Sequence, residues 1–530
     1  MSDEYDLNYA KRALFILAPI AIMVMYTEAM LIPSLPTIAS DFGVNSATVS
    51  WVLTAYLISG VVANPIVGKL GDIYGKKKIL VVVMSIYAVA VTLNGFAPNF
   101  DAFVAFRVLQ GIGLGMFPLA FSLIREEFPP KMVPKAQGTV SAMFGIGSAI
   151  SLPIAGYIAQ TFGWQYTYHT VIPVVILLDI LTIKYIRESR FVNRDSKIDY
   201  LGAAMMGISL TMLTLGFSEA PTWGWTSLEF FSVMALGGIL FASFIFYQSR
   251  AKFPLISTKL LSRRNVLVAN LAALVAGISM FMAYQSLSYL YELPTPVGFG
   301  LDILSTGLLL LPVSLMQIVG AAVASRSVVK SGTKPILVGA SALVSVFYFL
   351  LGLVSINGSN AGELSITFLA AMMMLGSAML NVVLINVLTF SIERKFLGVA
   401  TGMNTVFRLI GGAFGPSIAG SLLATYYSYR VYPMTVNGVT SYMTVKLPTD
   451  FAFQATFFIA AGVGLVMVLI ALMSRNIDIS KIPEKQVTTN TPTTDVTVNK
   501  SSNTGVSQSE FNFKGSDLNV KGSESQEKNV

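Results

Sequence analysis

The segment Gly68-Lys-Leu-Gly-Asp-Ile-Tyr-Gly-Lys-Lys-Lys78 is a short, basic, glycine-rich turn between two apolar stretches, residues 49–70 and 79–98. Each stretch has the roughly 20 apolar residues that a helix needs to cross the hydrocarbon core of a bilayer. Glycine allows a tight turn and a close approach of the two helices at the membrane edge. The segment therefore predicts two membrane-spanning helices joined by a positively charged loop.

The rest of the chain repeats this alternation of apolar stretches and polar loops. Its 530 residues are 54% hydrophobic and only 12% charged, whereas a soluble globular domain carries roughly 25% charged residues. We therefore predict an all-α integral membrane protein. The 14 predicted spans are residues 13–36, 49–70, 79–98, 102–125, 137–160, 167–187, 199–219, 228–249, 265–291, 303–325, 334–354, 365–390, 396–424 and 451–474.

The basic residues predict the orientation. Of the 35 Lys and Arg residues, Arg107 and Arg408 lie inside spans, and Arg430 and Lys446 lie in one alternate set of connecting segments. All the others lie in the opposite set or in the two tails. Because basic residues gather on the cytoplasmic side of membrane proteins, we expect both termini to be cytoplasmic. The predicted location is the cell (plasma) membrane, crossed many times.

Two long basic loops, 187–198 and 250–264, divide the spans into a 6+2+6 pattern. The sequence predicts five parts. They are a cytoplasmic N-terminus at 1–12, an N-terminal six-helix bundle at 13–187, two extra transmembrane helices with flanking basic loops at 188–264, a C-terminal six-helix bundle at 265–474, and a disordered cytoplasmic tail at 475–530.

The two groups of six show weak internal similarity. Pro153-Ile-Ala-Gly156 resembles Pro416-Ser-Ile-Ala-Gly420, and Gly75-Lys-Lys-Lys-Ile-Leu-Val resembles Gly332-Thr-Lys-Pro-Ile-Leu-Val. Secondary transporters are built from repeated halves that rock around a central binding site. The repeat therefore favours a carrier that works by alternating access.

The connecting segment 425–450 differs from the other loops. Residues 431–436 and 439–445 are rich in Tyr, Thr and Val, and Asn437-Gly438 lies between them. An Asn-Gly pair between two such runs is a strong signal for a β-hairpin with a two-residue turn. The alternative interpretation is an irregular loop.

Composition also excludes several classes of function. The chain has no cysteine and one histidine, His169, so disulfides, thiolate chemistry and zinc–thiolate sites are excluded and a metal site is not expected. No paired acid or nucleophile with a base is visible, so we expect neither an enzyme nor a cofactor. The net charge of +8 comes from loops between spans, which is typical of membrane topology and not of nucleic-acid binding. A channel would need a repeated pore ring or filter.

The loop between the second and third spans resembles the signature loop of the major facilitator superfamily. The matching residues are Gly68, Asp72, Gly75, Lys76 and Lys77, whereas Ile73 stands where the family often has a basic residue. Asp72 can favour a nearby helix N-terminus or a basic partner. We expect these residues to take part in conformational gating.

The fourth span contains Phe103-Val-Ala-Phe-Arg-Val-Leu-Gln-Gly-Ile-Gly113. A charge inside a span is costly unless it faces a partner or water. The run resembles the superfamily motif whose arginine is linked to proton transfer, which implies such a role for Arg107, with Gln110 nearly one turn away. The alternative is that Arg107 snorkels to the membrane surface.

The fifth span contains Pro153 and Gly156, which we also expect to take part in conformational gating, and it resembles the antiporter motif of drug:proton antiporters. Ser148, Leu152 and Tyr157 stand where that motif has glycines, which leaves the direction of transport open. Stretches near 219–226, 254–265 and 402–412 narrow the resemblance to the fourteen-helix drug:proton antiporter family. As a set, these motifs cover about residues 10–475.

Two acids inside spans are candidates for proton binding. Glu28 lies in the middle of the first span and Asp179 in the middle of the sixth. Alignment to the family on Leu35-Pro-Thr-Ile38 puts Thr27 at the place of the usual acid, and one residue rotates a side chain by about 100° around the helix. Glu28 is our preferred proton or cation site, and the alternative is a structural partner for Arg107 or for the backbone. For Asp179 the alternative is neutral burial against a neighbouring helix.

Polar residues in several spans are candidates for the substrate cavity. We expect Gln110, Gln285, Asn381, Asn404 and Arg408 to line it, although each could instead bridge two helices. Together the features predict a monomeric secondary active transporter of small molecules, embedded in the lipid bilayer. The expected function is proton-coupled export of amphipathic or cationic compounds (multidrug efflux). The alternative is a gradient-driven importer or exchanger of a small metabolite.

Overall fold

The computed structural model describes residues 6–129, 132–189, 191–192, 197–393, 397–436 and 439–477. Within these residues, 14 helices are long and apolar enough to cross a membrane. The predicted all-α membrane fold is therefore confirmed. The predicted disorder of the tail, for residues 478–530, lies outside the described part of the chain.

The first group of helices is α1 (Leu7–Ala29) with η1 (Ile32–Ser34) and α2 (Leu35–Asp41), α3 (Ser46–Val49) with α4 (Trp51–Tyr74), α5 (Lys76–Gly95), α6 (Phe100–Gly111) with η2 (Ile112–Gly115) and α7 (Met116–Glu127), α8 (Val133–Phe162) and α9 (Gln165–Tyr185). The middle pair is α10 (Tyr200–Trp223) and α11 (Leu228–Arg250), followed by the short α12 (Thr258–Leu261).

The last group is α13 (Arg264–Glu292), α14 (Ile303–Ser331), α15 (Thr333–Val354) with η3 (Ser355–Ala361), α16 (Glu363–Ser391), α17 (Leu397–Thr425) and α18 (Asp450–Leu472). Strands β1 (Tyr427–Val436) and β2 (Val439–Pro448) connect α17 to α18. They pair antiparallel from Tyr427↔Pro448 to Val436↔Val439. The predicted turn, Asn437-Gly438, lies outside the described residues.

Polar side chains cap the starts of several helices, and one of these caps begins α1 earlier than hydropathy predicts. Asp6 accepts a hydrogen bond from the Tyr9 amide at 3.0 Å and starts α1 six residues before the predicted span. Asp302 accepts from the Ser305 amide at 2.7 Å and starts α14. An oxygen at this position satisfies an amide that has no partner inside the helix.

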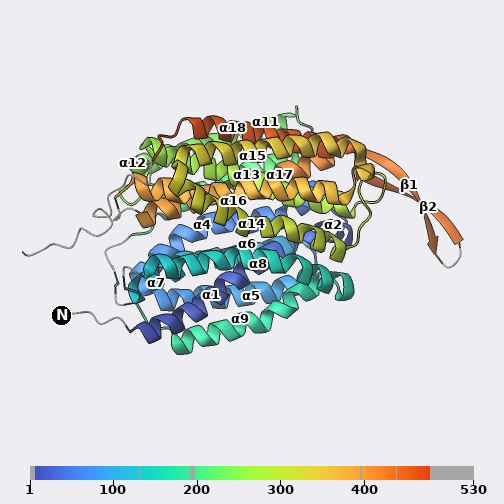
Figure 1. Cartoon of the computed structure of the whole chain (residues 1–530). Helices are drawn as coiled ribbons and strands as arrows, with labels where there is room; N and C mark the ends of the chain where they lie inside the picture. The colour runs from blue at the N-terminus through green and yellow to red at the C-terminus, as the bar shows by residue number, and fades with distance from the viewer. Residues whose placement is uncertain are drawn as a thin grey trace, which may run out of the picture. The chain divides into compact units, whose positions relative to one another are not determined.

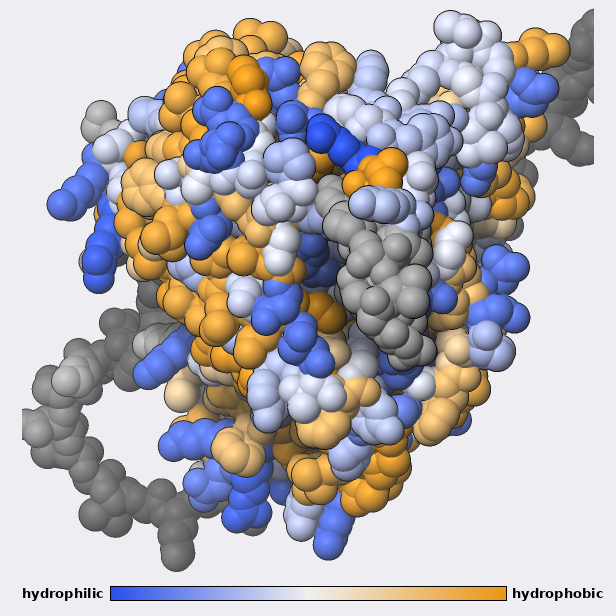
Figure 2. Space-filling view, turned by 90° about the vertical axis from the view of Figure 1, so that its right-hand side faces the viewer, coloured by the Kyte–Doolittle hydropathy of each residue, from blue (hydrophilic) through white to orange (hydrophobic). Residues whose placement is uncertain are grey.

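The long helices lie roughly parallel (Figure 1). Helices α1 and α4–α9 form the N-terminal bundle, and α13–α18 form the C-terminal bundle; the two meet where α8 packs on α14 and α4 packs on α17. Helix α11 packs mainly on α10, and α10 packs on α17 and α4. We call the end from which the β-hairpin projects the hairpin end, and the opposite end, which carries Lys76–Lys78, the basic end. Figure 2 views the hairpin end, where polar and apolar residues are mixed.

The two bundles repeat one structural detail at the basic end. Gly75 and Gly332 both have positive φ, 105° and 79°, and both precede a helix. Glu188, which follows α9, accepts hydrogen bonds from the amides of Lys77 and Lys78 at 2.9 and 3.0 Å. Asn476, which follows α18, accepts one from the Lys334 amide at 3.0 Å. The internal repeat seen in the sequence therefore corresponds to equivalent helix starts, one capped by a charged side chain and the other by a neutral one.

Candidate functional site

Arg107 lies at the centre of a buried polar cluster in the N-terminal bundle. Its side chain is 0% exposed. Its Nε donates to the Val52 carbonyl at 2.7 Å, and its guanidinium carbon lies 4.5 Å from the centroid of the Tyr56 ring. A snorkelling arginine would place its charged group in water, and this one is held inside the bundle.

Gln110 connects Arg107 to α5. Its Oε1 accepts hydrogen bonds from Arg107 Nη1 at 2.9 Å and from Asn94 Nδ2 at 3.1 Å. Within the described residues, Arg107 Nη2 and Gln110 Nε2 are buried without a hydrogen bond of ordinary geometry, although the Tyr168 and Tyr87 hydroxyls interact with these two side chains. Since buried polar atoms normally have partners, these atoms are suited to hold water or a polar ligand.

Glu28 lies where the two bundles meet. Arg408 of α17 and Arg107 of α6 both act on its carboxylate electrostatically, and so it interacts with both bundles. Among the described residues it forms no ion pair, and its Oε2 is buried without a hydrogen-bond partner. An unpaired carboxylate at membrane depth is a candidate for proton or cation binding.

The one-residue offset between Thr27 and Glu28 has a structural consequence. Thr27 is buried and its hydroxyl bonds to the Tyr87 hydroxyl of α5 and to the Val24 carbonyl of its own helix. Thr27 therefore faces the interior of the N-terminal bundle. Glu28, about 100° further around α1, interacts with Arg408 of the other bundle.

The C-terminal bundle brings a second polar group to this region. Tyr284 of α13 interacts electrostatically with Glu28. Its hydroxyl accepts a hydrogen bond from Gln317 Nε2 at 3.0 Å and lies 3.3 Å from Ser314 Oγ. Sequence reasoning missed Tyr284, because a tyrosine in an apolar span is most often core.

The other predicted cavity residues have different surroundings. Gln285 Nε2 donates to the Ser46 carbonyl at 3.2 Å, which joins the two bundles near the hairpin end. Asn404 Nδ2 donates to the Ala269 carbonyl at 2.9 Å and bridges α17 to α13 within one bundle. Asn381 is half-buried on α16. Of the five candidates, Arg408 acts on Glu28 electrostatically, and Gln110 is bonded to Arg107, which also acts on it.

Asp179 is separate from this cluster. It is half-buried on α9, and its Oδ2 accepts a hydrogen bond from Ser85 of α5 at 3.0 Å. Its Oδ1 is buried and has no partner among the described residues. None of the interactions described for Glu28 involves Asp179. The structure therefore does not bring the two acids to one site.

The signature loop forms a charged network at the basic end. Lys76 Nζ lies 2.5 Å from Glu126 of α7 and 3.4 Å from Asp72, and it donates to Ser189 at 3.3 Å. Lys77 Nζ donates to the Ile183 carbonyl of α9 at 2.8 Å. These contacts tie α4, α5, α7 and α9 into one body.

Gly75 of this loop has a steric role, whereas Gly68 does not. A Cβ on Gly75 would lie 2.6 Å from the Glu188 carboxyl carbon, and the positive φ is itself unfavourable for other residues. A Cβ on Gly68 would be 3.7 Å from Pro118, an ordinary contact. Sequence reasoning missed Glu126 and Glu188, because acids at helix ends are common and their partners are distant in sequence.

Helix α8 packs closely on α14 around Pro153 and Gly156. A Cβ built on Gly156 would lie 2.9 Å from the Ile303 carbonyl oxygen. Leu152 occupies a position where the family motif has glycine, and here Gly307 of α14 supplies the space, because its Cβ would lie 2.4 Å from the Leu152 carbonyl oxygen. Tyr157 is 54% exposed, so its side chain does not have to fit between the two helices.

The two bundles are joined by hydrogen bonds near the hairpin end. Ser46 Oγ donates to the Gly420 carbonyl at 3.0 Å, Thr54 Oγ1 to the Ala413 carbonyl at 3.1 Å, and Ser288 Oγ to the Ile32 carbonyl at 2.6 Å. The described structure is therefore one in which the bundles are closed against each other at this end.

Known proteins resemble this chain in sequence and fold. The Multidrug transporter protein MdtP of Bacillus subtilis (strain 168) is 28% identical over 74% of this chain and 71% of its own length. The Tetracenomycin C resistance and export protein of Streptomyces glaucescens is also 28% identical, over the same shares of the two chains. A solved structure of a D-xylose–proton symporter has a TM-score of 0.59 at 14% identity and covers 89% of this chain and 99% of its own.

A family model described as Major Facilitator Superfamily matches residues 17–416 and 275–504. This match spans most of the chain and agrees with the fold of 14 candidate membrane spans among the described residues. It also confirms the resemblance seen in the sequence and the prediction that the protein is not an enzyme. The chain therefore belongs to the Major Facilitator Superfamily and is a multi-pass membrane transporter of small molecules.

Proposed function

We propose that the protein exports amphipathic or cationic compounds across the plasma membrane, as a monomer, in exchange for protons. The names of its relatives support export, since one is a multidrug transporter and another a resistance and export protein. Proton exchange is supported by the residues around Glu28. The basic residues of the basic end support an orientation with both termini in the cytoplasm.

Glu28 carries the proposal. Both Arg408 and Arg107 act on its carboxylate electrostatically, and it forms no ion pair among the described residues. Burying a charged group away from water is expensive, so a neutral or paired state is favoured. Either a proton or a cationic compound can neutralise this carboxylate. Because they compete for one group, binding of the compound displaces the proton, which is the basis of exchange.

Arg107 sets the electrostatic environment in this scheme. It is held by Val52, Gln110 and Tyr56, so its charge stays at a fixed place relative to Glu28. A fixed positive charge favours release of the proton from the carboxyl. Arg408 lies on the other bundle, and its distance from Glu28 therefore changes when the bundles rock. The affinity of Glu28 for a proton then differs between the two conformations.

Alternating access requires that the hairpin end opens. The hydrogen bonds of Ser46, Thr54 and Ser288 between the bundles must then break. Each such bond contributes about 0.6 kcal/mol in a membrane protein. The network of Lys76 and Glu126 lies within the N-terminal bundle, so that bundle moves as a rigid unit.

Transport in liposomes tests this proposal. The full chain is reconstituted, a pH gradient is imposed, and internal pH is recorded when tetraphenylphosphonium is added. We expect the compound to trigger proton movement in the unchanged protein and not in Glu28→Gln. Asp179→Asn is the matched control, since it also neutralises an acid within a span, and it should behave like the unchanged protein.

Two outcomes would refute parts of the proposal. Normal proton movement in Glu28→Gln together with loss in Asp179→Asn would assign coupling to the other acid. If no compound in a panel of lipophilic cations triggered proton movement, and a metabolite were instead taken up along the gradient, the protein would be an importer. The departures from the antiporter motif at Ser148, Leu152 and Tyr157 are the observation that favours this second function.

A further inference from the structure

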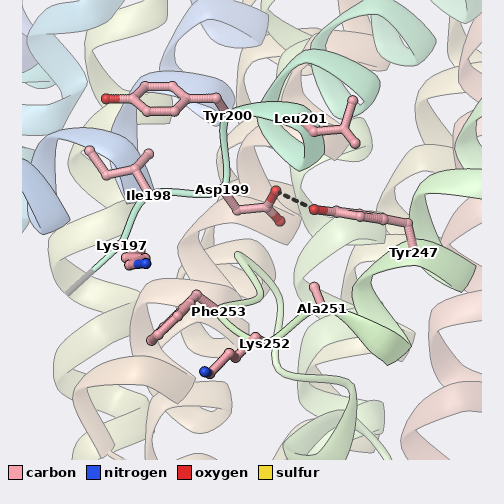
Figure 3. Close-up of a pocket in the computed structure, with 9 residues that line it drawn as sticks. All are labelled: Lys197, Ile198, Asp199, Tyr200, Leu201, Tyr247, Ala251, Lys252 and Phe253. Carbon is pink, nitrogen blue, oxygen red and sulfur yellow. Dashed lines mark hydrogen bonds between the residues drawn. The ribbon is translucent and has the colours of Figure 1, made fainter. Parts of the chain in front are cut away.

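A pocket of about 310 Å³ opens at the basic end beside the two extra helices. Residues 197–201, at the start of α10, form one side, and residues at the end of α11 and just after it form the other (Figure 3). The second group is Tyr247, Ala251, Lys252 and Phe253. The position is the membrane edge, where spans end and polar segments begin.

The acid in this pocket is used for structure. Asp199 Oδ1 accepts hydrogen bonds from the Gly202 amide at 2.8 Å and from the Tyr247 hydroxyl at 3.1 Å. Its Oδ2 accepts one from Gln248 Nε2 at 2.7 Å. Figure 3 shows the hydrogen bond between Asp199 and Tyr247. The carboxylate therefore joins α10 to α11, and its negative charge also acts on Lys69 of α4.

Two lysines in the lining of the pocket outnumber this one acid. Lys197 and Lys252 line the pocket, and neither is in an ion pair with another residue of the described part of the chain. Lysine ammonium groups bind phosphate as point charges. The pocket therefore favours an anion.

The rim of the pocket is apolar and faces outward. Tyr200 and Leu201 are 66% and 58% exposed, on the first turn of a helix that spans the membrane. A small soluble anion would not bury this apolar rim, whereas the acyl chains of a lipid can pack against it. Basic pockets between transmembrane helices at the membrane edge are suited to anionic lipid head groups.

We infer that this pocket binds the phosphate head group of an anionic phospholipid, with Lys197 and Lys252 as its cationic contacts. The lipid would also be linked to the signature loop. Lys69 of α4, next to Gly68, donates to the carbonyls of Lys197 and Phe253, both at 3.3 Å. A bound head group would therefore lie beside the contacts that hold the extra helices against the N-terminal bundle. The inference does not depend on proton coupling or on the direction of transport.

Lipid retention by the full-length protein tests the inference. The protein is purified in detergent, titrated with phosphatidylglycerol or phosphatidylcholine, and the bound lipid is counted by native mass spectrometry. We expect phosphatidylglycerol to be retained more tightly than phosphatidylcholine. The double variant Lys197→Gln/Lys252→Gln should hold phosphatidylglycerol roughly 20-fold more weakly.

The matched control is Lys259→Gln/Lys330→Gln, which removes two exposed lysines outside the pocket lining. It should retain phosphatidylglycerol like the unchanged protein. Equal retention by the pocket variant and the control, or equal retention of the two lipids, would overturn the inference. A third arm adds sn-glycerol 3-phosphate as competitor. If it displaced the lipid at equal concentration, the pocket would be a site for a free phosphate compound and the lipid assignment would be wrong.

Discussion

The N-terminal and C-terminal bundles share one architecture and differ in how firmly their charges are held. Arg107 is fully buried and bonded to Val52 and Gln110, whereas Arg408 is half-buried and its guanidinium makes no hydrogen bond to another described residue. At the basic end, Glu188 caps α5 and Asn476 caps α15. The difference indicates that the charge of Arg107 is held at one place in the first bundle, whereas the charge of Arg408 in the second bundle can change its position.

The largest expected difference between the two bundles is the loss of stability when the arginine of each is replaced. Arg107→Met leaves the Val52 carbonyl without its partner and removes one of the two donors to Gln110 Oε1, so we expect the free energy of unfolding to fall by about 3 kcal/mol. Arg408→Met should lower it by only about 0.5 kcal/mol. Thermal melting in detergent measures both. Equal losses of stability would show that the two arginines are held alike.

Changing the charge of each helix cap should change the stability of the protein, and the two variants should change it in opposite directions. Glu188→Gln removes a negative charge from the N-terminus of α5 and should destabilise by about 1 kcal/mol. Asn476→Asp adds such a charge at α15 and should stabilise by about 0.5 kcal/mol. Melting temperatures of the two variants check this prediction, and it fails if both move the same way.

The contact between the bundles should respond to loss of one hydrogen bond. Ser288→Ala removes the bond to the Ile32 carbonyl and weakens closure of the hairpin end by about 0.6 kcal/mol. Because the chain has no cysteine, spin labels can be attached at Tyr166→Cys and Leu364→Cys, which are exposed on the two bundles. Pulsed electron spin resonance should show a larger share of long distances in the variant. An unchanged distance distribution would mean that this bond does not hold the end closed.

The smallest effect concerns the start of α1. The Tyr9 amide, with help from Arg187, holds the pKa of Asp6 below its usual range. A lowered pKa stabilises the folded protein above the ordinary value of about 4, and this contribution is lost as pH falls through the lowered value. The melting temperature of Asp6→Asn should therefore be lower than that of the unchanged protein at pH 6, and the two should approach each other at pH 3. A constant difference would contradict this account.

The fold could be predicted because long apolar stretches and loop motifs are local in sequence. The site could be predicted only in part. Glu28, Arg107 and Gln110 were visible as polar residues inside spans, but the roles of Gln285 and Asn404 as contacts between helices depend on which way each helix is rotated. Glu188 was not found, because its partners at Lys77 and Lys78 lie far away in the sequence.

Proton release on ligand binding tests the central claim, that Glu28 exchanges a proton for a cationic compound, most directly. Tetraphenylphosphonium is added to weakly buffered protein in detergent, and both binding and the change in pH are recorded. We predict that the unchanged protein and Asp179→Asn release protons as they bind the compound, and that any binding by Glu28→Gln releases none. Proton release by Glu28→Gln, or binding to the unchanged protein without release, would contradict the account.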